Sequence, residues 1–243
     1  MLQINKFNKI IAANWKLNGS LLFIDEYFKK FNEIPTDSNV CNIICPPSIY
    51  LNYCQSKADH FYLGTQDCSN YEKGAYTGEI SASMLNDLNV KFCLVGHSET
   101  RQLFGISDND VKTKSENLIK NNINPILCIG ETLAQKEKKL TKEVLYNQVT
   151  NCMTSSSSNK TTIIAYEPIW AIGSGLTPTL DEIEEIHAFL KNEIKNYTDY
   201  KILYGGSVKS TNAKEILSLN SVDGVLVGGA SLDPLEFINI AKA

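Results

Sequence analysis

The chain has 243 residues, of which 43% are hydrophobic and 21% are charged, a composition typical of a globular protein in water. Its 23 basic and 27 acidic residues give a net charge of −4, which argues against nucleic acid as a partner. Seven scattered cysteines without a Cys-x-x-Cys pair argue against both a disulfide framework and a metal site. The sequence shows neither a secretory segment at its start nor an apolar run of membrane-spanning length, so we expect a cytoplasmic protein without a membrane partner.

Eight short apolar runs alternate along the chain with longer segments of mixed polarity. Most of these runs are almost continuously hydrophobic, which is typical of parallel strands that are buried on both faces. In chain order, the expected strands are Lys9–Ala13, Asn42–Cys45, Phe61–Leu63, Phe92–Val95, Pro125–Ile129, Thr162–Tyr166, Lys201–Tyr204 and Gly224–Val227.

The segments between the runs include clear helical patterns. In Leu180–Lys195, for example, the apolar residues recur at the spacing of one helix face, and we expect Thr177 and Pro178 to begin this helix. Eight strand–helix units in a chain of this length predict a single (β/α)8 barrel domain over residues 1–243, with eight parallel strands ringed by helices. An open, doubly wound sheet is the alternative.

In such a barrel the carboxyl ends of all strands face one mouth, so the residues that follow the runs can be considered together. Asn14 and Lys16 follow the first run, His97 the fourth and Glu167 the sixth. The proline after Glu167 favours extended geometry, which places this carboxylate at the end of its strand. Lys16 alone could be a solvated lysine and His97 alone a loop histidine. Together, an amide, an ammonium, an imidazole and a carboxylate at one mouth form a much more specific signal.

Glycine-rich turns follow the last two runs, at Gly205–Ser207 and Gly228–Gly229. Tight turns alone would explain these glycines. At the ends of the seventh and eighth strands, however, they occupy the usual phosphate-binding corner of barrels. Glycine lets backbone amides approach an anion closely, so this corner is expected to bind phosphate.

The segment after Glu167 is a short apolar stretch between Pro168 and the glycines Gly173 and Gly175. This layout is typical of a lid that hinges at its ends and excludes water when it closes. An ordinary strand-to-helix loop is the alternative.

Six segments resemble, in order and spacing, the signature segments of the triosephosphate isomerase family. They are Ala13–Lys16, Gly96–Glu99, Cys128–Glu131, Glu167–Gly173, Tyr204–Val208 and Val227–Ser231. The resemblance extends over nearly the whole chain. It implies a TIM barrel that interconverts D-glyceraldehyde 3-phosphate and dihydroxyacetone phosphate through an enediolate, a reaction of glycolysis and gluconeogenesis. It implies no metal and no organic cofactor.

The resemblance also implies a role for each residue at the mouth. Glu167 would be the base that moves the proton between adjacent carbons, and His97 would stabilise the oxyanion as a neutral imidazole. Lys16 would add positive charge and Asn14 an amide hydrogen bond. The substrate phosphate would be bound by Asn14, Lys16, Gly173, Ser207, Gly228 and Gly229.

A homodimer is a further implication of the resemblance. The segment Gly74–Glu79 resembles the long loop with which family members contact the neighbouring subunit. Thr77 would approach Asn14 and Lys16 of the other subunit, and Gln66 would support the loop. The chain departs from the family pattern at Asp67, Tyr76, Thr100, Ser174 and Leu176. These departures concern the closing rate of the lid and the polar contacts of the dimer interface.

Two other functions stay open on the residues alone. The phosphate-binding glycines would also suit another sugar-phosphate isomerase or epimerase, although such an enzyme does not require the whole set of residues at the mouth. A catalytically silent barrel kept for binding would be expected to have lost Lys16, His97 or Glu167, and all three are present.

Overall fold

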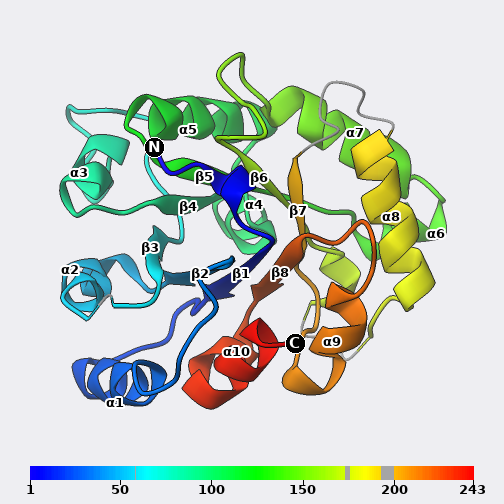
Figure 1. Cartoon of the computed structure of the whole chain (residues 1–243). Helices are drawn as coiled ribbons and strands as arrows, with labels where there is room; N and C mark the ends of the chain where they lie inside the picture. Colours follow the sequence, from blue (N-terminus) through cyan, green and yellow to red (C-terminus); the bar gives the residue numbers. More distant parts are fainter. Residues whose placement is uncertain (58, 173–175, 193–199) are drawn as a thin grey trace.

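The computed structural model describes residues 1–57, 59–172, 176–192 and 200–243. Within these residues eight parallel strands form a closed barrel, in which each strand pairs with the next and β8 pairs with β1 (Figure 1). The strands are β1 (Lys9–Asn14), β2 (Val40–Cys45), β3 (Tyr62–Thr65), β4 (Phe92–Val95), β5 (Asn124–Ile129), β6 (Ile163–Tyr166), β7 (Lys201–Tyr204) and β8 (Gly224–Val227).

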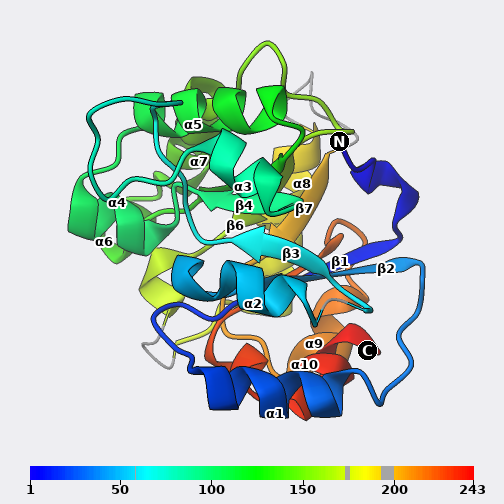
Figure 2. The same cartoon turned by 90° about the vertical axis from the view of Figure 1, so that its left-hand side faces the viewer.

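Helices surround the strands (Figure 1). They are α1 (Leu21–Phe31), α2 (Leu51–Gln55), α3 (Ala82–Asp87), α4 (Ser98–Phe104), α5 (Asp108–Lys120), α6 (Leu133–Glu137), α7 (Thr141–Cys152), α8 (Leu180–Asn192), α9 (Ser210–Leu217) and α10 (Pro234–Ala241). Short 3-10 turns are η1 (Ile4–Lys6), η2 (Ser48–Tyr50), η3 (Ile169–Ala171) and η4 (Gly229–Leu232). Figure 2 shows that α10 packs beside both α1 and α9. None of the helices in the described part of the chain has the length and apolarity needed to cross a bilayer.

The closed barrel confirms the predicted fold class and rules out the open sheet. All eight predicted strands are present, although β2 begins at Val40, two residues earlier than expected. The start of α8 was predicted wrongly, because the helix begins at Leu180 and is capped by Thr179. The Glu182 amide donates to Thr179 Oγ1, and the Glu182 carboxylate accepts from the Thr179 amide. This reciprocal pair satisfies two of the otherwise unpaired N–H groups at the start of the helix.

Side chains alternate along the strands between the barrel interior and the helix layer. Ile10, Ala12 and Ile43 belong to the interior cluster, which also contains Ile4 and Phe7 from the segment before β1. Because Ile4 and Phe7 precede the first strand, they close the amino end of the barrel. The carboxyl end is left as the mouth at which a ligand can enter.

Candidate active site

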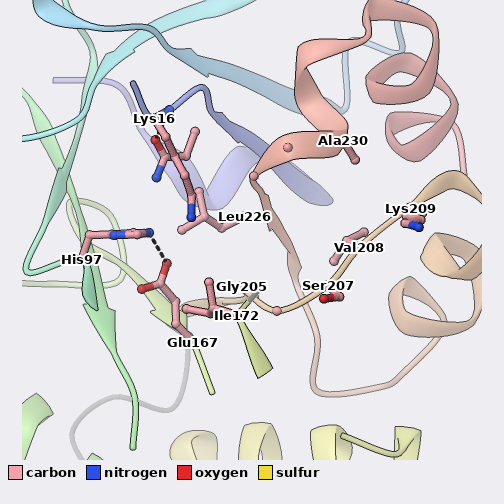
Figure 3. A pocket seen from close by; sticks show the side chains of 14 residues that line it. Lys16, His97, Glu167, Ile172, Gly205, Ser207, Val208, Lys209, Leu226 and Ala230 are labelled. Carbon is pink, nitrogen blue, oxygen red and sulfur yellow. Dashed lines mark hydrogen bonds and ion pairs between the residues drawn. The ribbon is translucent and has the colours of Figure 1, made fainter. Parts of the chain in front are cut away.

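A cavity of about 280 Å³ opens at the carboxyl ends of the strands. Figure 3 shows Lys16, His97 and Glu167 directed toward its centre from different strands. The residues that line it are Asn14, Lys16, His97, Glu167, Ile172, Gly205, Gly206, Ser207, Val208, Lys209, Leu226, Gly228, Gly229 and Ala230. The structure thus places the four predicted catalytic residues on the wall of one cavity, together with the two glycine-rich turns.

Glu167 directly follows β6 and is only 2% exposed. Its backbone N–H donates to the carbonyl of Ile129 on the neighbouring strand over 2.7 Å. The carboxylate is therefore fixed at the strand end. Its Oε1 lies 3.2 Å from Nε2 of His97, and its Oε2 accepts a long 3.4 Å hydrogen bond from the amide of Ser98.

His97 lies between β4 and α4 and caps this helix. Its Nδ1 accepts a 3.2 Å hydrogen bond from the amide of Glu99, so the proton of the neutral ring belongs on Nε2, the atom that faces Glu167. Burial lowers the pKa of His97, but the Glu167 carboxylate raises it, and the net direction is upward. The helix amide favours the neutral ring, whereas the neighbouring carboxylate favours the charged one. A substrate that separates the two side chains would remove the second influence and leave the first.

Lys16 has a backbone φ of +52°, in the left-handed region that side chains disfavour. Its amide donates to Asn14 Oδ1 over 3.0 Å, and its carbonyl accepts from Gln66 Nε2 over 2.8 Å. Its ammonium pairs with Glu99 Oε1 at 2.5 Å. The ammonium is therefore held at the edge of the cavity by a side chain next to His97, a contact that sequence reasoning did not find. The Gly96–Glu99 motif contains Glu99 but carries no signal for its partner.

The two glycine-rich turns lie on one side of the cavity, opposite His97 (Figure 3). A Cβ atom at Gly228 would lie 3.5 Å from Cε of Lys16, so this turn adjoins the lysine stem. The carbonyl of Gly228 accepts from the amide and hydroxyl of Ser231, which fixes the turn that leads into η4. Ser207 is held by the side-chain amide of Asn212, which donates to its carbonyl over 3.1 Å. The predicted phosphate-binding residue Gly173 lies outside the described residues, as does Ser174.

Glu131 anchors the first part of the segment after Glu167. It is 1% exposed, and its Oε1 accepts from Nε1 of Trp170 over 2.8 Å and from the hydroxyl of Tyr166 over 3.3 Å. Burial raises the pKa of the Glu131 carboxyl. The ammonium of Lys136 lies 3.5 Å from the centre of the Trp170 ring. The sequence motif contains Glu131, but its contact with Trp170 comes from tertiary structure.

The two residues predicted for the dimer loop lie in different places. Gln66 lies beside the cavity and donates to the carbonyls of Lys16 and Cys45. Thr77 lies in the exposed loop between β3 and α3 and does not line the cavity. In this loop the rings of Tyr71 and Tyr76 stack at 3.6 Å.

Comparison with known proteins agrees with this geometry. A family model described as triosephosphate isomerase matches residues 9–243. A protein named triosephosphate isomerase from Hahella chejuensis is 40% identical over 242 residues, which is 97% of this chain and 98% of the relative. One of the same name from Francisella tularensis subsp. mediasiatica is 42% identical over 241 residues, 96% of this chain and 95% of the relative. Another, from Mesomycoplasma hyorhinis, is 41% identical over 238 residues, 95% of this chain and 96% of the relative.

Proposed function

This chain belongs to the triosephosphate isomerase family, and on that premise we propose that Asn14, Lys16, His97 and Glu167 carry its reaction. The enzyme is an isomerase that interconverts D-glyceraldehyde 3-phosphate and dihydroxyacetone phosphate, a step of glycolysis and gluconeogenesis. The observation that supports these roles best is the 3.2 Å approach of His97 Nε2 to Glu167 Oε1 within a cavity that Lys16 also lines.

The proposed mechanism is a proton transfer between neighbouring carbons. The Glu167 carboxylate removes the proton from the carbon next to the carbonyl, and the electron pair moves onto the carbonyl oxygen to give an enediolate. His97 donates its Nε2 proton in a hydrogen bond to the substrate oxygens, and Lys16 offsets their negative charge. The hydroxyl proton on the first carbon passes to the former carbonyl oxygen by way of Nε2 of His97, so that a new carbonyl forms on the first carbon as Glu167 returns its proton to the other carbon. The reaction involves no net oxidation, so these side chains suffice without a redox cofactor.

The substrate phosphate is proposed to bind at the glycine-rich side of the cavity. Lys16 supplies a cation and Asn14 an amide there, while the turns at Ser207 and at Gly228–Gly229 bring backbone close to the ligand. Gly173 belongs to the same proposal, although it lies outside the described residues. Binding of this remote group can assist the reacting centre, because its binding energy can be used to orient the carbons against Glu167.

We further propose that the enzyme is a homodimer and that the loop Gly74–Glu79 enters the neighbouring subunit. Large apolar side chains are exposed after three adjacent strands: Leu17 after β1, Ile49 after β2, and Tyr71 and Tyr76 after β3. Exposed apolar groups that gather in this way mark an interaction surface. Thr77 lies in this loop, and we propose that it approaches the other subunit's cavity.

A cytoplasmic location and a single domain over residues 1–243 complete the proposal. The seven cysteines are free and buried, and proteins with many unpaired thiols are typical of a reducing compartment. The barrel takes its first strand from Lys9 and its last from Val227, so its closure needs both ends of the chain.

Turnover of glyceraldehyde 3-phosphate tests the function and the base together. NADH loss through glycerol-3-phosphate dehydrogenase would be followed for the wild type, Glu167→Gln and the control Glu143→Gln, which alters an exposed residue of α7. We expect fast turnover by the wild type and the control, and a loss of roughly 10²–10⁴-fold in Glu167→Gln. A folded wild type without turnover would contradict the function. A fully active Glu167→Gln would contradict the assignment of the base.

A further inference from the structure

The backbone conformation of Lys16 has to be held in place by other residues. A left-handed conformation at a residue with a side chain costs roughly 1–2 kcal/mol, and it persists only where the surrounding structure determines it. The direction of the Lys16 ammonium depends on this backbone. Whatever fixes the backbone of Lys16 therefore also fixes its charge relative to the substrate.

Gln66 is the side chain that clamps the Lys16 backbone from outside its own loop. Its Nε2 donates to the carbonyl of Lys16 over 2.8 Å and to the carbonyl of Cys45 over 3.0 Å. These bonds use both hydrogens of the amide group. One amide thus ties the end of β2 to the residue whose conformation is disfavoured. The clamp works only if the backbone of Gln66 is itself fixed.

Two anchors fix the backbone around Gln66. On one side, Thr65 pairs with Cys93 in the barrel. On the other, the Lys114 ammonium donates hydrogen bonds to both oxygens of the Asp67 carboxylate, over 2.8 Å to Oδ1 and 2.7 Å to Oδ2. Lys114 comes from the middle of α5 and is 4% exposed, so the outer helix layer holds the chain immediately after Gln66.

We propose that Asp67 and Lys114 are positioning residues for Lys16, acting through the side chain of Gln66. The proposal rests on the function assigned to Lys16 above, which is to bind the phosphorylated substrate. It gives a role to Asp67, which stands where the family usually has an asparagine. With an asparagine the Lys114 ammonium would donate to one neutral amide oxygen, whereas the carboxylate carries a charge and accepts from it with both oxygens.

The Asp67–Lys114 pair is a weak source of net stability. Burial raises the pKa of the Asp67 carboxyl, and the neighbouring Lys114 lowers it by less. The Lys114 side chain is buried, whereas that of Asp67 is 32% exposed. Removing both charges from such a pair is often nearly neutral for stability, whereas removing Asp67 alone leaves the buried ammonium uncompensated. A pair of this kind therefore contributes mainly to geometry, and its loss should appear in substrate binding.

The test compares Lys114→Met, the double variant Asp67→Asn/Lys114→Met, and Gln66→Met alone and combined with Lys114→Met. The double variant removes both charges and leaves no buried ion without a partner, so it guards against a failure to fold. KM and kcat for glyceraldehyde 3-phosphate and the inhibition constant of inorganic phosphate would be measured for each. We expect KM and the phosphate inhibition constant to rise by roughly three- to tenfold, with a smaller change in kcat, because a displaced Lys16 weakens binding of the anion. In the Gln66→Met background, Lys114→Met should have no further effect on KM.

Lys191→Met provides the matched control. It breaks a partly buried lysine–aspartate pair with Asp223 at 2.9 Å, just before β8 and therefore at the opposite end of the barrel. The control should lower the melting temperature without changing KM.

Wild-type turnover tests the proposed function separately. With wild-type turnover intact, three results would each overturn the inference: unchanged KM in Lys114→Met and the double variant, effects of Gln66→Met and Lys114→Met that multiply, or an equal rise of KM in Lys191→Met. A KM that returns to normal at higher protein concentration would also overturn it, because the loop would then act through subunit association.

Discussion

The imidazole of His97 and the carboxylate of Glu167 face each other at 3.2 Å, although they follow β4 and β6, which are separated in the barrel by β5. The proposed base and the proposed oxyanion donor are thus adjacent in the cavity. The Glu167 carboxylate raises the pKa of His97, because the two side chains are close together and almost completely buried. The pKa of His97 therefore depends on how close the Glu167 carboxylate lies to its ring.

We predict that Glu167→Gln lowers the pKa of His97. In the wild type the Glu167 carboxylate raises this pKa against the opposite effect of burial. Its removal leaves burial, Lys16 and the Glu99 amide, which favour the neutral ring, and only the weaker effect of the Glu99 carboxylate, which favours the charged ring. NMR titration of the ¹⁵N-labelled imidazole would measure the change and would also show the proton on Nε2. An unchanged or higher pKa in the variant would contradict the prediction.

The interaction between His97 and Glu167 also affects stability. Because the folded-state pKa of His97 is above the unfolded value of 6.5, this pair stabilises the fold below pH 6.5. The contribution is lost as the pH rises through the folded-state pKa.

Lys16→Met is predicted to weaken binding of substrate and of inorganic phosphate. The ammonium lies at the edge of the cavity beside the Gly228 turn, and hydrogen bonds from a charged donor contribute about 1.5–3 kcal/mol. We therefore expect KM to rise by roughly ten- to a hundredfold. Steady-state kinetics with phosphate as competitor would measure this, with the exposed Lys138→Met as control. If Lys16→Met, like the control, kept the wild-type KM and the wild-type inhibition by phosphate, Lys16 would be a solvated side chain and the prediction would be wrong.

The proposed dimer predicts that a charge at Leu17 separates the subunits. Leu17 is 96% exposed and directly follows Lys16, so burying it against another subunit would remove its whole side chain from water. Leu17→Glu should sediment as a monomer, while the wild type sediments as a dimer. Leu235→Glu is the control, because Leu235 is also exposed but lies in the first turn of α10, where a carboxylate is favourable. Monomeric wild type, or a Leu17→Glu variant that stays dimeric, would contradict the prediction.

The strands could be predicted from the sequence because each is buried on both faces and appears as a continuous apolar run. The strand β2 was predicted to begin at Asn42, a polar residue that separates Val40 and Cys41 from the rest of the apolar run, yet Asn42 is buried and Val40 pairs with Lys9 in the barrel. The cap of α8 was misplaced because Thr177 and Pro178 also fit the sequence pattern of a helix start, whereas the cap in the structure is Thr179. There the reciprocal hydrogen bonds with Glu182 decide where the helix begins.

The residues at the mouth could be found because position at a strand end follows from the order of the strands. The contacts between them could not. Gln66 reaches Lys16 from β3 to β1, and Glu99 reaches Lys16 from α4. Such contacts join segments far apart in the chain and leave no local periodicity. The left-handed backbone of Lys16 has no sequence signal either, since lysine is not a residue type that favours it.

His187 gives the protein a buried histidine that its reaction does not use. It is 0% exposed and lies against the rings of Tyr166 and Tyr204. Neither of its ring nitrogens has a hydrogen-bond partner among the described residues. Burial lowers its pKa to about 4, and the nearby backbone of Ser221 offsets only part of this effect. Hence His187 stays neutral in the folded protein while the pH falls well below the ordinary value of 6.5.

We predict that this histidine makes the fold sensitive to acid. Between pH 6.5 and about 4, the unfolded chain binds a proton at His187 that the folded chain does not bind, so stability falls as the pH drops through this window. The full difference is on the order of 3 kcal/mol. His187→Phe keeps a ring of similar shape but cannot titrate, and its stability should therefore fall less between pH 7 and pH 5. Urea unfolding at fixed protein concentration would measure the free energy at each pH.

The comparison depends on the slope with pH and not on the absolute stability, because the phenylalanine ring also changes packing around Tyr166 and Tyr204. His60→Phe is the matched control, since His60 is exposed and the same substitution there leaves the buried site intact. This control should keep the wild-type slope. If His187→Phe loses stability toward acid as steeply as the wild type, then the acid sensitivity arises elsewhere. The carboxyl groups of the partly buried Asp67 and the buried Glu131 could not replace His187 as its source. Desolvation raises the pKa of each, so protonation on acidification relieves a poorly solvated charge in both.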